Sequence, residues 1–162
     1  MCGLIAANHA SVVVLTDYQE IVMDLIDINI QTCNPKPNDC ELFAAQLDWE
    51  KMDDPNFYDS LDYTNKDQTV EGKFRDIQFD YVIGSDIVYW PQSIQPLYKV
   101  LLKLFERQPN LVFYICYIER SVNVHTELLA TLKKSFKIEE IGQEITKPIT
   151  PSAYIYRITR LG

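Results

Sequence analysis

Residues 79–91 read Phe79-Asp80-Tyr81-Val82-Ile83-Gly84-Ser85-Asp86-Ile87-Val88-Tyr89-Trp90-Pro91. An apolar, β-branched run stops at Gly84-Ser85-Asp86, and Trp90-Pro91 then prevents the strand from continuing. This pattern is typical of a buried strand in an open α/β sheet that ends in a carboxylate. Ligands bind at the carboxyl ends of the strands in such sheets. We therefore expect the chemistry at this rim, with Asp86 and Tyr89 as candidate catalytic residues.

A structural role for Asp86 is the alternative. Aspartate often caps or braces the turn that follows a strand. The motif by itself does not separate this role from binding or catalysis, so the rest of the chain has to be considered.

The composition restricts the class of protein. The chain has 162 residues, of which 47% are hydrophobic and 23% charged, and this suits one α/β domain with a substantial core. The net charge of −8 argues against a general affinity for nucleic-acid backbones and fits a basic partner or a protein that presents lysines. The four cysteines form no Cys-x-x-Cys pair and no histidine stands at metal spacing, so we expect no metal site.

The amino-terminal stretch does not match a secretory signal peptide. Residues 1–15 are apolar but lack a positively charged start, and Asn8-His9 interrupts the apolar run. No run in the sequence reaches membrane-spanning length. We expect a protein of the cytoplasm or the nucleus with no membrane partner.

Hydrophobic periodicity predicts alternating strands and helices. Predicted strands lie at residues 11–16, 41–47, 79–84, 111–118, 137–141 and 153–158, the last two as an antiparallel hairpin joined by a Pro-containing loop. Predicted helices lie at residues 18–32, 97–105 and 124–136. The polar stretch 50–76 is predicted to be a mobile excursion loop. The order indicates an α/β fold, mostly parallel with an antiparallel end, in a single domain over 1–162.

Five segments together resemble a known family. Asp86-Ile87-Val88-Tyr89 fills a D/E-x-x-Y/F motif after the fourth strand, Val14-Leu15-Thr16-Asp17-Tyr18 matches the second strand with its terminal acid, and Leu47-Asp48-Trp49 matches the motif after the third. Cys2-Gly3-Leu4-Ile5-Ala6-Ala7 matches the helix after a glycine loop, and Asn29-Ile30 the end of the next helix. The chain thus resembles the seven-β-strand S-adenosylmethionine-dependent methyltransferases, and more closely the protein-lysine branch called methyltransferase family 16.

The resemblance implies four cofactor-binding residues. Asp17 would accept hydrogen bonds from the ribose hydroxyls of S-adenosylmethionine, and Asp48 would bind the adenine amino group with Trp49 packed against the ring. Ser85 would lie near the methionine end of the cofactor. The alternatives are a helix cap for Asp17, and a turn aspartate with a partly buried anchor for Asp48 and Trp49.

The resemblance also implies the reaction. Asp86 would hold the incoming lysine ammonium near the sulfonium, and Tyr89 would line the lysine channel. The family includes enzymes that modify chaperones and translation factors, so the implied partner is a protein that presents a lysine, with these two classes as examples. In the family, a first strand and its glycine-rich loop precede the segment that matches Cys2-Gly3-Leu4-Ile5-Ala6-Ala7. The resemblance therefore implies a Rossmann-like sheet that is N-terminally truncated here.

Other functions remain to be weighed against methyl transfer to lysine. A non-catalytic, methyltransferase-like binding module without the glycine loop is the main alternative. A nucleic-acid methyltransferase of this fold would usually carry Pro-Pro where this chain has Ile87-Val88, and the negative charge also disfavours nucleic acid. A nicotinamide dehydrogenase would need a hydride-transfer acid that the sequence does not supply.

Two further signals are interpreted as structural, and a third is left open. His9 and His125 have no partner acids at metal spacing and are expected to be surface or helix residues. Tyr154 and Tyr156 are expected to alternate across an edge strand rather than to form an aromatic cage. Glu119-Arg120, after the fifth strand of the family, could contact the substrate or form a surface ion pair.

Overall fold

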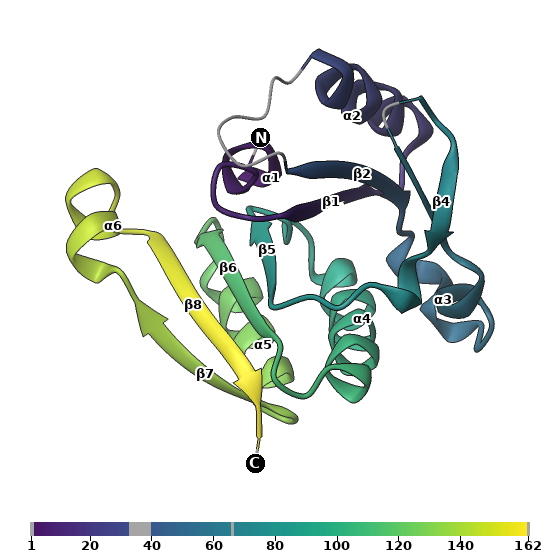
Figure 1. Ribbon diagram of the computed structural model, residues 1–162. Coiled ribbons are helices and arrows are strands. Elements are labelled where there is room, and N and C mark those ends of the chain that lie inside the picture. The colour runs from purple at the N-terminus through teal and green to yellow at the C-terminus, as the bar shows by residue number, and fades with distance from the viewer. Residues whose placement is uncertain (1, 33–39, 66, 162) are drawn as a thin grey trace. The chain divides into compact units, whose positions relative to one another are not determined.

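The computed structural model of the protein describes residues 2–32, 40–65 and 67–161. The chain divides into two units, Met1–Gln78 and Phe79–Gly162, each with a four-stranded sheet of its own (Figure 1). The prediction of an α/β fold is confirmed. The single domain over residues 1–162 stays a prediction.

The first unit is built on a sheet with the strand order β1-β2-β3-β4. β1 (Val12–Asp17) and β2 (Glu41–Gln46) are parallel, and β3 (Asp62–Thr64) and β4 (Val70–Lys73) extend the sheet as an antiparallel hairpin. The helices of this unit are α1 (Cys2–Ala6), α2 (Glu20–Thr32), η1 (Trp49–Asp53), α3 (Phe57–Ser60) and η2 (Phe74–Asp76).

Helix α2 covers the parallel strands of the first unit with one of its apolar faces. Met23, Ile26 and Ile30 follow the helical period and pack in a cluster with residues of α1, β1 and β2. Ile21, Leu25 and Ile28 lie on another face and are exposed. The predicted helix is thus confirmed, whereas its apolar residues do not all face the core.

The prediction of a mobile loop over 50–76 is wrong for most of this segment. Its described residues form two 3-10 helices, α3 and the β3–β4 hairpin. Tyr58, Leu61 and Phe74 are buried, and the rings of Tyr58 and Phe74 meet edge to face at 5.8 Å. These three apolar residues, spaced widely among charged ones, fold a segment whose average composition is polar.

The second unit has the strand order β5-β6-β8-β7. β5 (Tyr81–Ser85) and β6 (Val112–Ile118) are parallel, whereas β8 (Ala153–Arg160) is antiparallel to both β6 and β7 (Phe136–Ile141). The helices of this unit are η3 (Pro91–Ser93), α4 (Ile94–Arg107), α5 (Val122–Leu132) and α6 (Gln143–Ile149).

The core of the second unit lies on one face of β6. Phe113, Ile115 and Tyr117 alternate along the strand and are almost fully buried. Helices α4 and α5 supply the facing residues, which are buried leucines, valine, isoleucine and phenylalanine: Ile94, Leu97, Val100, Leu101, Leu104, Phe105, Leu128 and Leu132. Strand β6 is therefore the centre of this unit.

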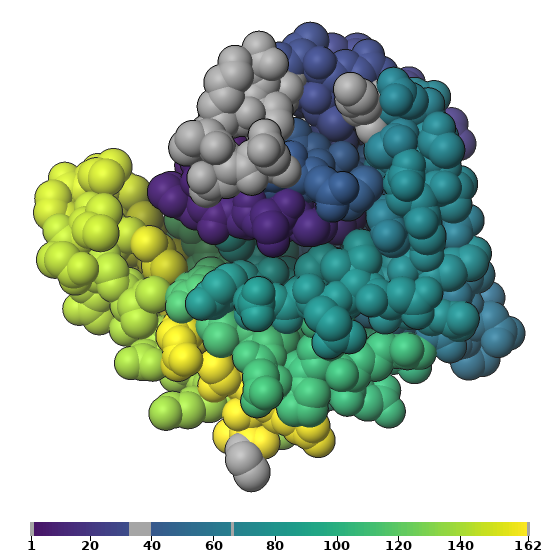
Figure 2. All heavy atoms as spheres, in the orientation of Figure 1, coloured from purple at the N-terminus to yellow at the C-terminus, as the bar shows by residue number. Residues whose placement is uncertain are grey.

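Two further details differ from the sequence predictions. The sheets are mixed rather than mostly parallel, because among the described strands only the β1–β2 and β5–β6 pairs are parallel. The connection between β7 and β8 contains α6, which stands at the surface (yellow-green in Figure 2) and includes Pro148. The Rossmann-like arrangement as a whole stays a prediction.

Strands β1 and β5 are also less covered than their apolar sequences predict. In β5 the side chains of Tyr81 and Ile83 are 62% and 53% exposed, and Val12 of β1 is exposed as well. Within the described residues, β1 pairs only with β2 and β5 only with β6. Apolar character predicts a strand here, but burial also requires neighbours on both sides.

Candidate functional site

The tetrad from Asp86 to Tyr89 begins where β5 ends. Ser85 is paired with Cys116 of β6, and the next residue, Asp86, adopts a left-handed conformation with φ of 54°. The Asp86 N–H donates to the Cys116 carbonyl at 2.8 Å, which fixes the turn. Aspartate and asparagine tolerate this backbone conformation better than most residues. Burial of Val88 then anchors the tetrad and leaves Tyr89 exposed.

Gly84 permits the close return of the chain after β5. A Cβ atom at this position would lie 2.5 Å from Ile87 Cδ1 and 3.3 Å from the Phe113 ring. A side chain here would therefore force Ile87 out of its position above the strand. The absence of a side chain at Gly84 therefore leaves room for Ile87 next to β5.

Asp86 is paired with Arg120, which follows the end of β6. The Arg120 Nη1 and Nη2 atoms donate to the Asp86 Oδ1 and Oδ2 atoms, both at 2.6 Å. The same guanidinium lies over the Tyr89 ring, 4.9 Å from its centroid. A carboxylate and an aromatic face together form a favourable site for a cation. The structure thus places Asp86, Tyr89 and a cationic group in contact.

The carboxylates of Asp17 and Asp48 lie at the corresponding edge of the first unit. Asp17 is the last residue of β1 and is paired with Gln46, the last residue of parallel β2, so both strands present their carboxyl ends on one side. The Asp17 Oδ1 atom accepts from the N–H groups of Tyr18 and Gln19, at 2.8 and 3.1 Å. Oδ2 is the oxygen of Asp17 that could accept a ligand hydroxyl.

Asp48 caps the 3-10 helix that follows β2. Its Oδ1 atom accepts from the Glu50 N–H at 3.0 Å, and its Oδ2 atom is 3.5 Å from Lys51 Nζ. Trp49 is half-buried and opens that helix. The turn role expected as the alternative for Asp48, beside a partly buried Trp49, is therefore observed. The helix cap expected for Asp17 is not, because its Oδ1 atom bonds the N–H groups of Tyr18 and Gln19, which both precede α2.

Comparison with models of protein families shows to which family the chain belongs. A family model described as lysine methyltransferase matches residues 1–135. The chain belongs to the lysine methyltransferase family. The matched region contains both strand ends described above and the tetrad at Asp86. Comparison with curated proteins finds no match.

The structure assigns the predicted site residues of this family member to two groups. Asp17, Asp48 and Trp49 lie in the first unit, and Asp86 and Tyr89, with exposed Ser85, lie in the second. Each group is at the carboxyl end of a parallel strand pair. Their assembly into a single site stays a prediction.

Two absences concern the part of the chain that the structure describes. No group of three or more His, Cys, Asp or Glu side chains in it could hold a metal ion. None of its helices has both the length and the apolar character needed to cross a bilayer.

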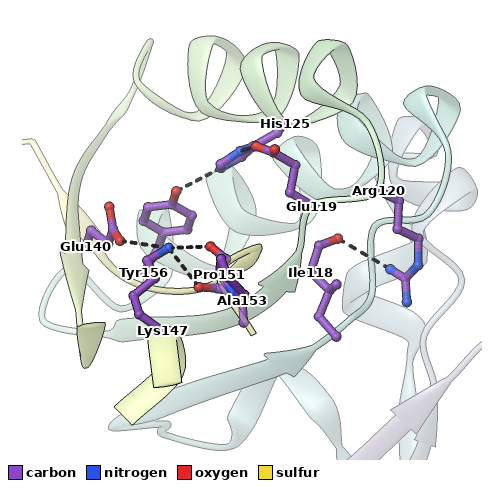
Figure 3. A network of polar contacts seen from close by, with 9 residues as sticks. All are labelled: Ile118, Glu119, Arg120, His125, Glu140, Lys147, Pro151, Ala153 and Tyr156. Atoms are coloured by element: carbon purple, nitrogen blue, oxygen red, sulfur yellow. Dashed lines mark hydrogen bonds and ion pairs between the residues drawn. The ribbon is translucent and has the colours of Figure 1, made fainter. Parts of the chain in front are cut away.

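A second polar cluster lies next to Arg120 in the second unit. The Nδ1 atom of His125 is hydrogen-bonded to the Glu119 carboxylate, and its Nε2 atom is 2.8 Å from the Tyr156 hydroxyl (Figure 3). His125 is buried on α5, so the prediction of an ordinary surface or helix residue missed its two partners. The sequence carries no signal for this cluster, because the three residues come from β8, α5 and the end of β6.

The prediction for Tyr154 and Tyr156 is wrong. Strand β8 lies between β6 and β7 rather than at an edge, and residues two apart on a strand share one face. Their rings accordingly stack at 5.9 Å, and both contact the His125 ring. Lys147 Nζ lies 3.6 Å from the centre of the Tyr154 ring. These aromatic groups pack together at the end of the sheet next to Glu119.

In the second unit, the surroundings of Asp86, Tyr117 and Tyr156 shift the pKa values of these side chains. The Arg120 guanidinium, bonded to both carboxylate oxygens, holds the pKa of Asp86 below its usual value. Burial raises the pKa of Tyr156, and burial with nearby Glu119 raises that of Tyr117. At neutral pH Asp86 is therefore an ionised carboxylate, and Tyr117 and Tyr156 are neutral phenols.

The lowered pKa of Asp86 predicts a loss of stability in acid. Because the pKa is lower in the folded state than its unfolded value near 3.8, the ion pair stabilises the fold fully above that value. The contribution disappears as the pH falls through the folded-state pKa. We expect the difference in free energy of unfolding between wild type and Asp86→Asn to be constant above about pH 5 and to shrink below about pH 4 in urea titrations. A difference that stays constant into stronger acid would contradict this pairing.

Proposed function

We propose that this lysine methyltransferase transfers the methyl group of S-adenosylmethionine to a lysine side chain of a protein substrate. The observation that carries the proposal is the cation site formed by Asp86 and Tyr89 at the carboxyl end of β5. A lysine substrate arrives as an ammonium ion, which such a site attracts. The family match supports the reaction type.

The residues of the first unit fit an adenosyl group. At the end of β1, the Oδ1 atom of Asp17 accepts hydrogen bonds from two backbone N–H groups. Its Oδ2 atom could accept a hydrogen bond from a ribose hydroxyl. Asp48 would accept from the adenine amino group, and Trp49 would pack against the ring. Ser85 of the second unit would lie near the methionine end. When bound, S-adenosylmethionine supplies an activated methyl group, so the protein does not have to generate the electrophile.

The protein's own contribution is to bind and align the amine. Asp86 would draw the ammonium to the rim, and Tyr89 would orient the nitrogen once its proton has passed to water. Alignment of this kind can lower a barrier by several kcal/mol, up to roughly 7–11 in ideal cases. The net charge of −8 suits a basic protein substrate, for which a chaperone or translation factor of the cytoplasm or nucleus is our candidate class.

A binding module without turnover is the second candidate. One observation favours it: Arg120 already occupies both oxygens of Asp86. If Arg120 never leaves, the carboxylate cannot receive a substrate amine, and the domain would serve only as a partner surface.

The proposal is tested with S-adenosylmethionine carrying a labelled methyl group and an array of lysine-containing peptides. A matched array has arginine in place of every lysine. We expect label on the lysine array only, and mass spectrometry should locate it on the side-chain nitrogen. Equal labelling of both arrays, or label on neither, would contradict transfer to lysine.

A further inference from the structure

We infer that Arg120 is a built-in competitor of the substrate: its guanidinium fills the cation site of Asp86 and Tyr89 and has to swing out when a lysine ammonium binds. The inference rests on the proposed function, because it names the group that the lysine displaces. It makes Arg120 a residue that sets the affinity and selectivity of the site.

Occupancy of the site follows from the geometry. Each oxygen of Asp86 receives one N–H from Arg120 at 2.6 Å, and the guanidinium lies 4.9 Å from the centre of the Tyr89 ring. An ammonium can take the position that contacts both this carboxylate and this ring face only when the guanidinium has moved away. Both ligands are monocations, so one replaces the other without leaving Asp86 unpaired.

The Arg120 side chain can move while its backbone stays in place. The neighbouring Glu119 is fixed twice, by its N–H to the Ser152 carbonyl at 2.8 Å and by its carboxylate to His125. Figure 3 shows Glu119 directed toward His125 and Arg120 directed away from this cluster. The Arg120 side chain is 48% exposed, and its hydrogen bond to the Ile118 carbonyl is long at 3.5 Å.

Asp86, by contrast, is held firmly. Its carboxyl side chain is only 22% exposed, and its N–H is bonded to the Cys116 carbonyl. Exchange therefore involves rotation of an exposed arginine over a fixed carboxylate. The consequence is selectivity: a neutral ligand gains nothing that offsets the lost ion pair, whereas an ammonium restores it.

Binding of n-butylammonium, which has the charged end of a lysine side chain, tests the inference without cofactor or turnover. NMR signals of the Tyr89 ring in the full chain report binding, with Tyr89→Phe used to assign them. A competitor that leaves the site free about a tenth of the time weakens apparent affinity about 10-fold. We therefore expect Arg120→Gln to bind n-butylammonium at least about 10-fold more tightly than wild type. Arg120→Lys, which cannot span both oxygens, should fall between them.

Matched variants complete the test. Arg157→Gln removes another partly exposed arginine of the same unit, one that pairs with Glu139, and should leave the affinity unchanged. The double variant with Arg120→Gln and Asp86→Asn should not show the tighter binding of n-butylammonium. The neutral analogue 1-butanol should bind wild type and the variants with equal affinity. Binding to Arg120→Gln no tighter than wild type, or a gain that survives loss of the Asp86 charge, would overturn the inference. Failure of methyl transfer in the peptide array would instead count against the proposed function.

Discussion

Asp86→Asn is expected to lower the rate of methyl transfer at least about 100-fold while the protein stays folded. Asparagine tolerates the left-handed backbone that Asp86 adopts, and it has nearly the same size. It carries no charge, so the site can no longer attract a lysine ammonium. The change also frees the guanidinium of Arg120, which would repel the substrate.

Asp80→Asn is the matched control for this experiment. Asp80 is exposed and lies just before the amino end of β5, opposite to the edge that holds Asp86. Rates are measured with labelled S-adenosylmethionine, and circular dichroism verifies the fold. We expect Asp80→Asn to retain activity. An Asp86→Asn protein as active as the control would remove the carboxylate from the mechanism.

Ile115→Ala is expected to destabilise the protein by about 2–5 kcal/mol. Ile115 is fully buried at the centre of β6, where its side chain faces the core of the second unit. Truncation removes apolar contacts and leaves a cavity that its neighbours cannot fill completely. Denaturant unfolding of the purified protein gives the free-energy difference.

Ile83→Ala provides the comparison. Ile83 is on the adjacent parallel strand but is 53% exposed, so its truncation should cost less than about 1 kcal/mol. Similar losses at both positions would show that the outer side of β5 is covered in solution. They would contradict the open strand described above.

The strand ends could be predicted from the sequence. Apolar runs that stop at Asp17 and at Gly84-Ser85-Asp86 identified β1 and β5, because side-chain chemistry changes abruptly where a strand leaves the core. The D-x-x-Y motif then identified the rim and led to the family, which the match over residues 1–135 confirms.

The pairing of Asp86 with Arg120 could not be predicted in the same way. The two residues are 34 positions apart and meet only because Ser85 lies beside Cys116 in the β5–β6 register. Periodicity predicts where strands lie but not how they align. The contacts of His125 were missed for the same reason.

The remaining wrong predictions arise because they infer the burial of a segment from its average composition. The stretch 50–76 is polar as a whole, yet buried Tyr58 and Phe74 organise it. Conversely, α2 is apolar on faces that the described residues leave exposed, such as Ile21 and Leu25. In each case burial depends on which few side chains find a partner, and composition does not reveal this.

The central claim concerns the cofactor: we propose that Asp17 and Asp48, after the two parallel strands of the first unit, bind one adenosyl group. Calorimetric titration of S-adenosylhomocysteine into the full chain tests it most directly. We predict saturable binding that Asp17→Asn weakens at least about 10-fold, since a hydrogen bond to a charged group is lost, while exposed Asp24→Asn on α2 leaves it unchanged. Absence of heat at high ligand concentration, or equal affinity in both variants, would contradict the account.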